Sequence, residues 1–180
     1  MDKLRDYEIA FKGLRDGQHE FIYEIDRNFF ELIDNSLIED GQLKANVLLT
    51  KQPTMLTLDF SIKGTIRTSC DRCLEPLDVP VKYRGKMYVK FGDNYDEPSD
   101  EILVIPHEEH QVNVAHLIYE FIGVSIPMQC VHPADKDGNP SCNPEMMAKL
   151  EEYKGGYSPS EADEIDPRWS ELKKLIGKNK

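Results

Sequence analysis

Residues 43–63 read LKANVLLTKQPTMLTLDFSIK, and apolar side chains stand at alternate positions on either side of Pro53. Successive side chains of a β-strand point to opposite faces, so this period of two predicts two strands that each bury one face. The positions expected to be buried are Leu43, Ala45, Val47, Leu49, Leu56, Leu58, Phe60 and Ile62, and Leu48 is the one exception to the alternation. The stretch therefore predicts a β-sheet with one covered face.

Strand-like segments continue on both sides of this stretch. Residues 79–91 predict one long strand, or two strands that meet at a bend near Gly85. Residues 92–100 are polar and acidic, and they predict a loop. The other predicted strands are 7–11, 20–25, 65–69 and 101–105. Several strands spaced in this way predict an antiparallel sheet or a partial β-barrel.

Two helices are predicted beside the sheet. Residues 27–33 would form a short one, and residues 112–124 a longer one. The longer segment has a single apolar stripe at helical spacing, made of Val114, Leu117, Ile118, Phe121 and Ile122. Such a stripe packs against a core, so we expect this helix to cover the sheet. The predicted fold class is α+β, with further helices at the C-terminus.

The C-terminal part shows two helix start signals. Asn143-Pro144 is typical of a helix N-terminus, and Gly155 of a stop, which gives a helix between them. Residues 155–165 are rich in Gly, Ser and acidic residues and predict a flexible linker. Residues 166–180 predict an amphipathic helix that docks either on this domain or on a partner. We therefore expect one α+β domain over residues 1–154, followed by the linker and this helix.

The composition excludes several classes of protein. The net charge of −11 argues against a protein that binds nucleic acid over its whole surface, or one that binds an anionic membrane. No apolar run approaches the roughly 20 residues of a transmembrane helix, and residues 1–10 lack the apolar part of a signal peptide. We expect a cytoplasmic protein. The common nucleophile, phosphate-loop, dinucleotide and zinc-protease motifs are missing, so we expect no enzyme.

The centre of the chain is basic although the whole is acidic. Residues 41–90 carry nine Lys and Arg against four Asp and Glu. A basic strip can bind phosphates when it folds onto one face. The candidate RNA-binding residues are Lys63, Arg67, Arg72, Arg84 and Lys86. The alternative is that these cations only keep a sheet soluble and its edges unpaired.

Four cysteines form two groups along the sequence. Cys70 and Cys73 form a CxxC motif, a tight turn that supplies two of the four ligands of a tetrahedral zinc ion. Cys130 and Cys142 follow the long helix and would supply the other two, with His132 as an alternate ligand. A structural zinc site is one interpretation, and thiols packed without metal are another. A redox pair is disfavoured, because no βαβ pattern surrounds the motif.

Residues 64–76, GTIRTSCDRCLEP, resemble the signature of the YceD-like family of large ribosomal RNA subunit accumulation proteins. The elements that follow are similar in order: an acidic segment, the helix over 112–124, and the step SIPMQC at 125–130. The resemblance covers about residues 40–145. In the second cysteine group the family more often has cysteines a few residues apart around a Gly, whereas this chain has Cys130 and Cys142. The resemblance implies a non-enzymatic role in the accumulation of large-subunit ribosomal RNA.

Two other functions remain as alternatives. The expected partners are ribosomal RNA or ribosomal and assembly proteins, with no membrane and no small-molecule substrate. The first alternative is an acidic protein–protein interaction module without direct RNA contact, since acidic surfaces suit basic ribosomal proteins. The second is a metal-dependent nuclease, which is disfavoured because no cluster of carboxylates or histidines is visible in the sequence.

Overall fold

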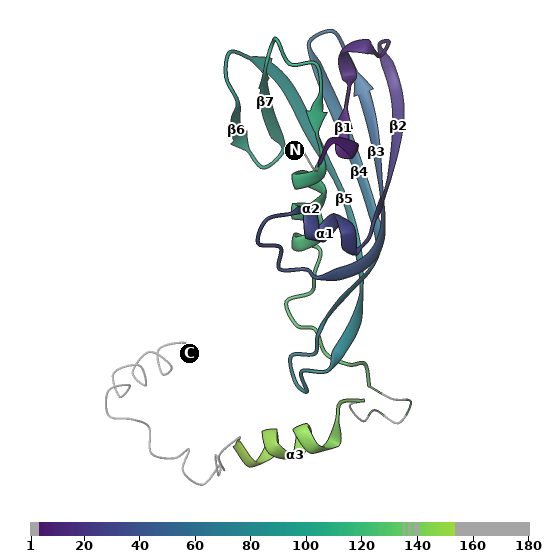
Figure 1. Ribbon diagram of the computed structural model, residues 1–180, viewed down its shortest axis with the longest axis vertical. Coiled ribbons are helices and arrows are strands. Elements are labelled where there is room, and N and C mark those ends of the chain that lie inside the picture. Colours follow the sequence, from purple (N-terminus) through teal and green to yellow (C-terminus); the bar gives the residue numbers. More distant parts are fainter. Residues whose placement is uncertain (1–3, 135, 137, 139–140, 154–180) are drawn as a thin grey trace, which may run out of the picture. The chain divides into compact units, whose positions relative to one another are not determined.

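The structure is a computed structural model that describes residues 4–134, 136, 138 and 141–153. Its internal contacts divide the chain into two units, residues 1–141 and 142–180. The first unit is shown in Figure 1. Its elements are η1 (Arg5–Tyr7), β1 (Glu8–Ile9), η2 (Phe11–Gly13), β2 (Gly17–Ile25), α1 (Arg27–Leu32), β3 (Asp40–Lys51), β4 (Met55–Ser69), β5 (Pro76–Gly92), β6 (Asp96–Ser99), β7 (Ile102–Pro106), β8 (Val112–Asn113) and α2 (Ala115–Val124).

Six strands of this unit form an open sheet in the order β2-β3-β4-β5-β7-β6. Neighbouring strands are antiparallel except β5 and β7, which run parallel with Tyr88 opposite Ile102. The short strands β1 and β8 pair with each other in a second, two-stranded sheet. The predicted α+β class is confirmed, and the large sheet ends at β2 and β6 and does not close into a barrel.

One face of the sheet is buried, and α1 and α2 lie on that face (Figure 1). Burial alternates along β3 and β4, as the period of two predicts. Every apolar position predicted to be buried in these strands is at most 6% exposed: Leu43, Ala45, Val47, Leu49, Leu56, Leu58, Phe60 and Ile62. We call this side the inner face and the opposite side the outer face.

Helix α2 is held to the inner face by aromatic packing. Phe121 stacks on Tyr83 with ring centroids 4.5 Å apart, and it meets the edge of Phe60 at 4.9 Å. A Cβ atom at Gly85 would collide with the Tyr83 ring, so this glycine makes room for the stack. Such aromatic pairs contribute about 0.5–1.5 kcal/mol each beyond the area they bury.

The hairpin of β4 and β5 reaches beyond the rest of the sheet. Pairing of β3 with β4 ends where Asp40 faces Arg67, whereas β4 and β5 stay paired as far as Ser69 and Pro76. Along the way, Gly64 has a φ angle of +157°, and a Cβ there would collide with the backbone of Gln42. The tip of the hairpin is the turn over residues 70–75, which contains the CxxC motif.

Several sequence predictions need correction. The segment 92–100 is not only a loop, because it contains β6 (Asp96–Ser99), whose four residues are all exposed. The long helix begins at Ala115 and not at Val112, because Val112 pairs with Ile9 in the second sheet. The segment 79–91 lies within one continuous strand, which confirms the first of the two alternatives predicted for it. The predicted linker over 155–165 and the helix over 166–180 lie outside the described residues.

The second unit contains one described helix, α3 (Pro144–Tyr153). Its predicted start is confirmed, since the Glu145 backbone N–H donates to Oδ1 of Asn143 at 2.9 Å, which is N-terminal capping by a side chain. Among the described residues, no helix combines the length and the apolar character needed to cross a membrane.

Candidate metal centre and nucleic-acid face

The CxxC turn closes the β4–β5 hairpin with backbone hydrogen bonds. The Cys70 N–H donates to the Glu75 carbonyl at 2.8 Å, and the Leu74 N–H donates to the Cys70 carbonyl at 2.9 Å. Leu74 has a φ angle of +61°, in the left-handed region that favours glycine. Its side chain is 67% exposed, so little packing compensates for this conformation. The turn keeps a strained residue directly after the second cysteine, and the sulfurs of the two cysteines lie within 4.8 Å of each other.

Backbone N–H groups point at the sulfur of Cys70. The Arg72 N–H donates to this Sγ at 3.5 Å, and Cys70 itself is buried. Burial raises the pKa of the Cys70 thiol, but hydrogen bonds from the backbone N–H groups of Cys73, Arg72 and His132 outweigh it and lower the pKa to about 6. The surrounding backbone therefore favours the thiolate, which is the form that binds metal.

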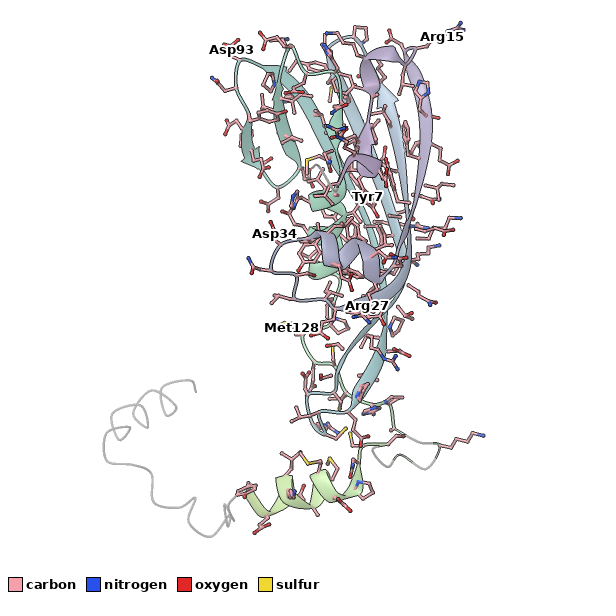
Figure 2. All side chains as sticks on the ribbon, in the orientation of Figure 1. Tyr7, Arg15, Arg27, Asp34, Asp93 and Met128 are labelled. Atoms are coloured by element: carbon pink, nitrogen blue, oxygen red, sulfur yellow. The ribbon has the colours of Figure 1, made fainter. Side chains whose placement is uncertain are left out.

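The segment that follows α2 packs onto this turn. The Asp71 N–H donates to the Cys130 carbonyl at 2.7 Å, and the Cys130 N–H donates to the Asp71 carboxylate at 2.5 Å. Figure 2 labels Met128, which is fully exposed, on this segment. Two residues beyond Cys130, Nδ1 of His132 lies 3.3 Å from Sγ of Cys73. Asp71 thus joins the turn to this segment by two hydrogen bonds. The sequence analysis did not identify this residue.

Three ligand atoms of the first unit gather at the turn. The sulfurs of Cys70 and Cys73 and one ring nitrogen of His132 lie within 4.8 Å of one another. Both cysteines are buried and the histidine is partly buried. A tetrahedral zinc ion with Zn–S bonds of about 2.3 Å holds its sulfurs roughly 3.8 Å apart. Two thiols and an imidazole at this spacing fit zinc with a small inward movement, and Cys142, the first residue of the second unit, is the candidate for the fourth ligand.

Cys130 is not a member of this group, although the sequence places it among the candidate ligands. Its Sγ lies 3.6 Å from the Pro127 carbonyl oxygen. Burial, together with the charges of Asp71 and Cys70, raises the pKa of the Cys130 thiol. Within the first unit, the structure thus brings together Cys70 and Cys73 with the alternate ligand, His132. Which of these residues bind metal stays a prediction.

The predicted RNA-binding residues divide between two places. Lys63, Arg67, Arg84 and Lys86 stand at exposed positions of β4 and β5, between buried residues of the inner face, so they lie on the outer face. Arg72 is exposed in the CxxC turn instead. The strand register adds Lys44 and Lys82, because Lys44 faces Lys63 and Lys63 faces Lys82 across adjacent strands. Both stand at polar positions of the alternation, a signal that the sequence also contains.

The ion pairs on this face leave part of the charge uncompensated. Arg67 approaches Asp78 at 3.6 Å, and Lys86 approaches Asp59 at 3.1 Å. No ion pair joins Lys44, Lys63, Lys82 or Arg84 to a carboxylate within the described residues. Like charges directly opposite each other destabilise a sheet, so Lys63 between two lysines does not serve stability, and the one acidic side chain opposite this row in the described strands is Glu24, which faces Lys44. The outer face therefore offers concentrated positive charge in an acidic protein.

Comparison with known proteins supplies the family. No curated protein and no solved structure matches the chain. A family model described as "Large ribosomal RNA subunit accumulation protein YceD" matches residues 58–176, which is more than half of the chain. The match includes the CxxC turn, strand β5, helix α2 and all four residues of the candidate metal centre. The chain therefore belongs to the YceD family.

Proposed function

We propose that this chain is a non-enzymatic accessory factor for the accumulation of large-subunit ribosomal RNA, and that it binds this RNA through the outer face of its sheet. The family model supports the first part. The observation that carries the second part is the row of Lys44, Lys63 and Lys82, which has no ion pair to a carboxylate in the described structure.

The row suits a phosphate backbone better than a protein surface. Adjacent strands lie about 4.8 Å apart, so three lysines on three strands form a short, continuous line of charge. Arg84 extends this line toward Lys86 along β5. Neutralising these cations with phosphates removes their mutual repulsion and releases counterions from the RNA. The contacts expected from such a face are with the backbone and carry little sequence information.

We further propose that a structural zinc ion is held by Cys70, Cys73, His132 and Cys142. In this set His132, the alternate ligand, replaces Cys130. The grouping of the ligand atoms of Cys70, Cys73 and His132 supports this assignment, and Cys142 is the further cysteine that the sequence offers. A bound zinc would tie the tip of the β4–β5 hairpin to the segment after α2, where Asp71 and Cys130 already meet. A site closed by four protein ligands is typical of structural and not of catalytic zinc.

Elemental analysis of protein purified without chelator tests the metal site. We expect one zinc per chain, lost in Cys70→Ser and His132→Ala and kept in Cys130→Ser. Zinc that is kept in His132→Ala but lost in Cys130→Ser would restore the all-cysteine set. No metal in the parent protein would leave the four residues as a packed polar cluster.

A charge-reversal variant tests the RNA face in cells. Lys44, Lys63 and Lys82 are changed together to Glu, and the variant replaces the parent gene. We expect the protein to leave the large-subunit precursor fractions of a sucrose gradient, and the level of large-subunit RNA to fall. The matched control changes Lys12, Arg15 and Lys149 to Glu, which alters the net charge equally at exposed positions elsewhere.

Two results would favour other functions. If the triple variant keeps its place in the gradient and the RNA level is unchanged, the outer face is not the RNA site, and the protein-interaction module becomes the better proposal. Cleavage of precursor RNA by the purified protein would favour a nuclease. The only group of metal-binding side chains among the described residues is the one at the CxxC turn, which has no carboxylate.

A further inference from the structure

More than half of the long strand β5 has one unpaired edge. On one side β5 pairs with β4 along nearly its whole length, from Pro76 to Lys90. On the other side it pairs with β7 only from Tyr88 to Gly92. Strand β7 begins opposite Tyr88 and does not run beside residues 82–87. No other strand in the described part of the chain pairs with them on this side.

The backbone of this edge is oriented for pairing. The Tyr88 N–H donates to the Glu101 carbonyl at 2.7 Å, on the side of β7. Residues two apart in a strand point their backbone groups to the same side. The N–H and C=O groups of Lys82, Arg84 and Lys86 therefore point to the open side. Pro80 limits the edge at its far end, since it has no N–H to donate.

A groove runs along this edge. It lies between the open part of β5, the start of β7 and the C-terminal half of α2. Tyr83, Leu103, Leu117 and Phe121 contribute apolar and aromatic surface to it. These side chains are half-buried or buried, so the floor is formed by the packed inner layer and not by mobile side chains.

The rim of the groove is acidic. Glu97, Asp100, Glu101 and Glu120 line it, and all four are exposed. Burial raises the pKa of Tyr83, and the negative charge of Glu101 raises it further. Glu101 therefore lies near the floor. Arg84 and Lys86 also line the groove, but they stand at outer-face positions, and Lys86 is bound to Asp59 there. The inner-face side of the groove is therefore negative, whereas Arg84 and Lys86 stand on its outer-face side.

We propose that this groove binds an extended, lysine- or arginine-rich segment of a partner protein, which adds as a strand to the open edge of β5. Main-chain hydrogen bonds to residues 82–86 supply affinity, and alternate side chains meet the apolar floor. The acidic rim selects basic residues and repels RNA. The open edge accommodates about five residues at roughly 3.3 Å each. This surface shares Lys82 with the lysine row, using its backbone and not its side chain, and it does not depend on the RNA-binding proposal.

The test measures binding of a labelled ten-residue peptide, in which lysine alternates with valine or threonine, to the full-length protein. We expect the peptide to bind, and the same peptide with glutamate in place of lysine not to bind. Glu101→Lys combined with Glu120→Lys should weaken binding about tenfold. The control pair Glu108→Lys with Glu145→Lys has the same change in charge at exposed positions outside the groove, and it should bind normally.

Two further measurements distinguish strand addition from general charge attraction. An N-methylated version of the basic peptide lacks donors for pairing and should bind much more weakly. Hydrogen exchange at the amides of Lys82, Arg84 and Lys86 should slow when the unmodified peptide is bound. Equal binding of the N-methylated peptide, unchanged exchange at these amides, or competition by single-stranded RNA through the groove would overturn the proposal.

Discussion

The two faces of the large sheet are formed by the same strands but differ in their role. On the inner face, positions such as Phe60 and Ile62 are at most 2% exposed and hold α2 in place. On the outer face of the same strand, Lys63 stands between two other lysines without an ion pair to a carboxylate among the described residues. Because strand side chains alternate, one sequence supplies both faces. Stability therefore depends on the inner face of the sheet, and the proposed function depends on the outer face.

The largest effect is expected on the inner face. Phe121→Ala removes the ring that packs on both Tyr83 and Phe60, and it should lower the free energy of unfolding by about 3–5 kcal/mol. Urea denaturation measures the loss. The control Val124→Ala lies on the same helix but is 73% exposed, and it should change stability by less than about 0.5 kcal/mol. Equal losses would contradict the claim that the stability resides in the inner face.

A backbone substitution in β4 should have the next largest effect. Gly64→Ala places a Cβ against the backbone of Gln42 at a φ angle that other residues rarely adopt, and it should cost about 1–3 kcal/mol. Gly123→Ala is the matched control, because Gly123 lies in helix α2 and a Cβ there meets nothing within 4 Å. That change should stabilise by about 0.5–1 kcal/mol. A neutral Gly64→Ala would show that β3 and β4 can move apart at this point.

The hairpin tip offers a smaller effect of the opposite sign. Leu74→Gly removes the strain of a left-handed residue whose side chain is mostly exposed, and it should stabilise by about 0.5–1 kcal/mol. Leu37→Gly provides the comparison, because Leu37 is 94% exposed and is not among the residues with positive φ. It should destabilise slightly through unfolded-state entropy. Thermal unfolding of both variants checks the sign of each change.

The smallest stability effect belongs to the outer face. Lys63→Gln removes repulsion between Lys63 and its two lysine neighbours, so the protein should become more stable by a few tenths of a kcal/mol, about 0.3–0.5. The same change should weaken RNA binding. Urea denaturation and RNA titration of one protein sample measure both quantities. A loss of stability together with unchanged RNA binding would reverse the roles assigned to the two faces.

Local periodicity predicted the part of the fold that depends on neighbours in sequence. The alternation through Leu43 to Ile62 identified β3, β4 and the residues they bury. It could not identify β6, because Asp96–Ser99 is polar, exposed and contains a proline. The parallel pairing of β5 with β7 was also beyond its reach, since nothing local marks which distant strands become neighbours.

The candidate metal centre was predictable only in part. The CxxC spacing identified Cys70 and Cys73, because both lie in one turn. The choice between Cys130 and His132 depends on how the segment after α2 meets that turn, and Asp71 holds the backbone of Cys130 there. Two residues further on, the ring of His132 reaches Cys73. This is a long-range contact that spacing alone does not encode.

Salt-dependent binding of a large-subunit ribosomal RNA fragment tests the central claim most directly. The full-length parent and the variant with Lys44, Lys63 and Lys82 changed to Glu are titrated between about 50 and 200 mM salt. We predict that the variant binds more weakly and that the slope of log K against log salt becomes shallower by about 2, as the loss of three phosphate contacts requires. Equal affinity and equal slope for the two proteins, with both folded, would contradict the account.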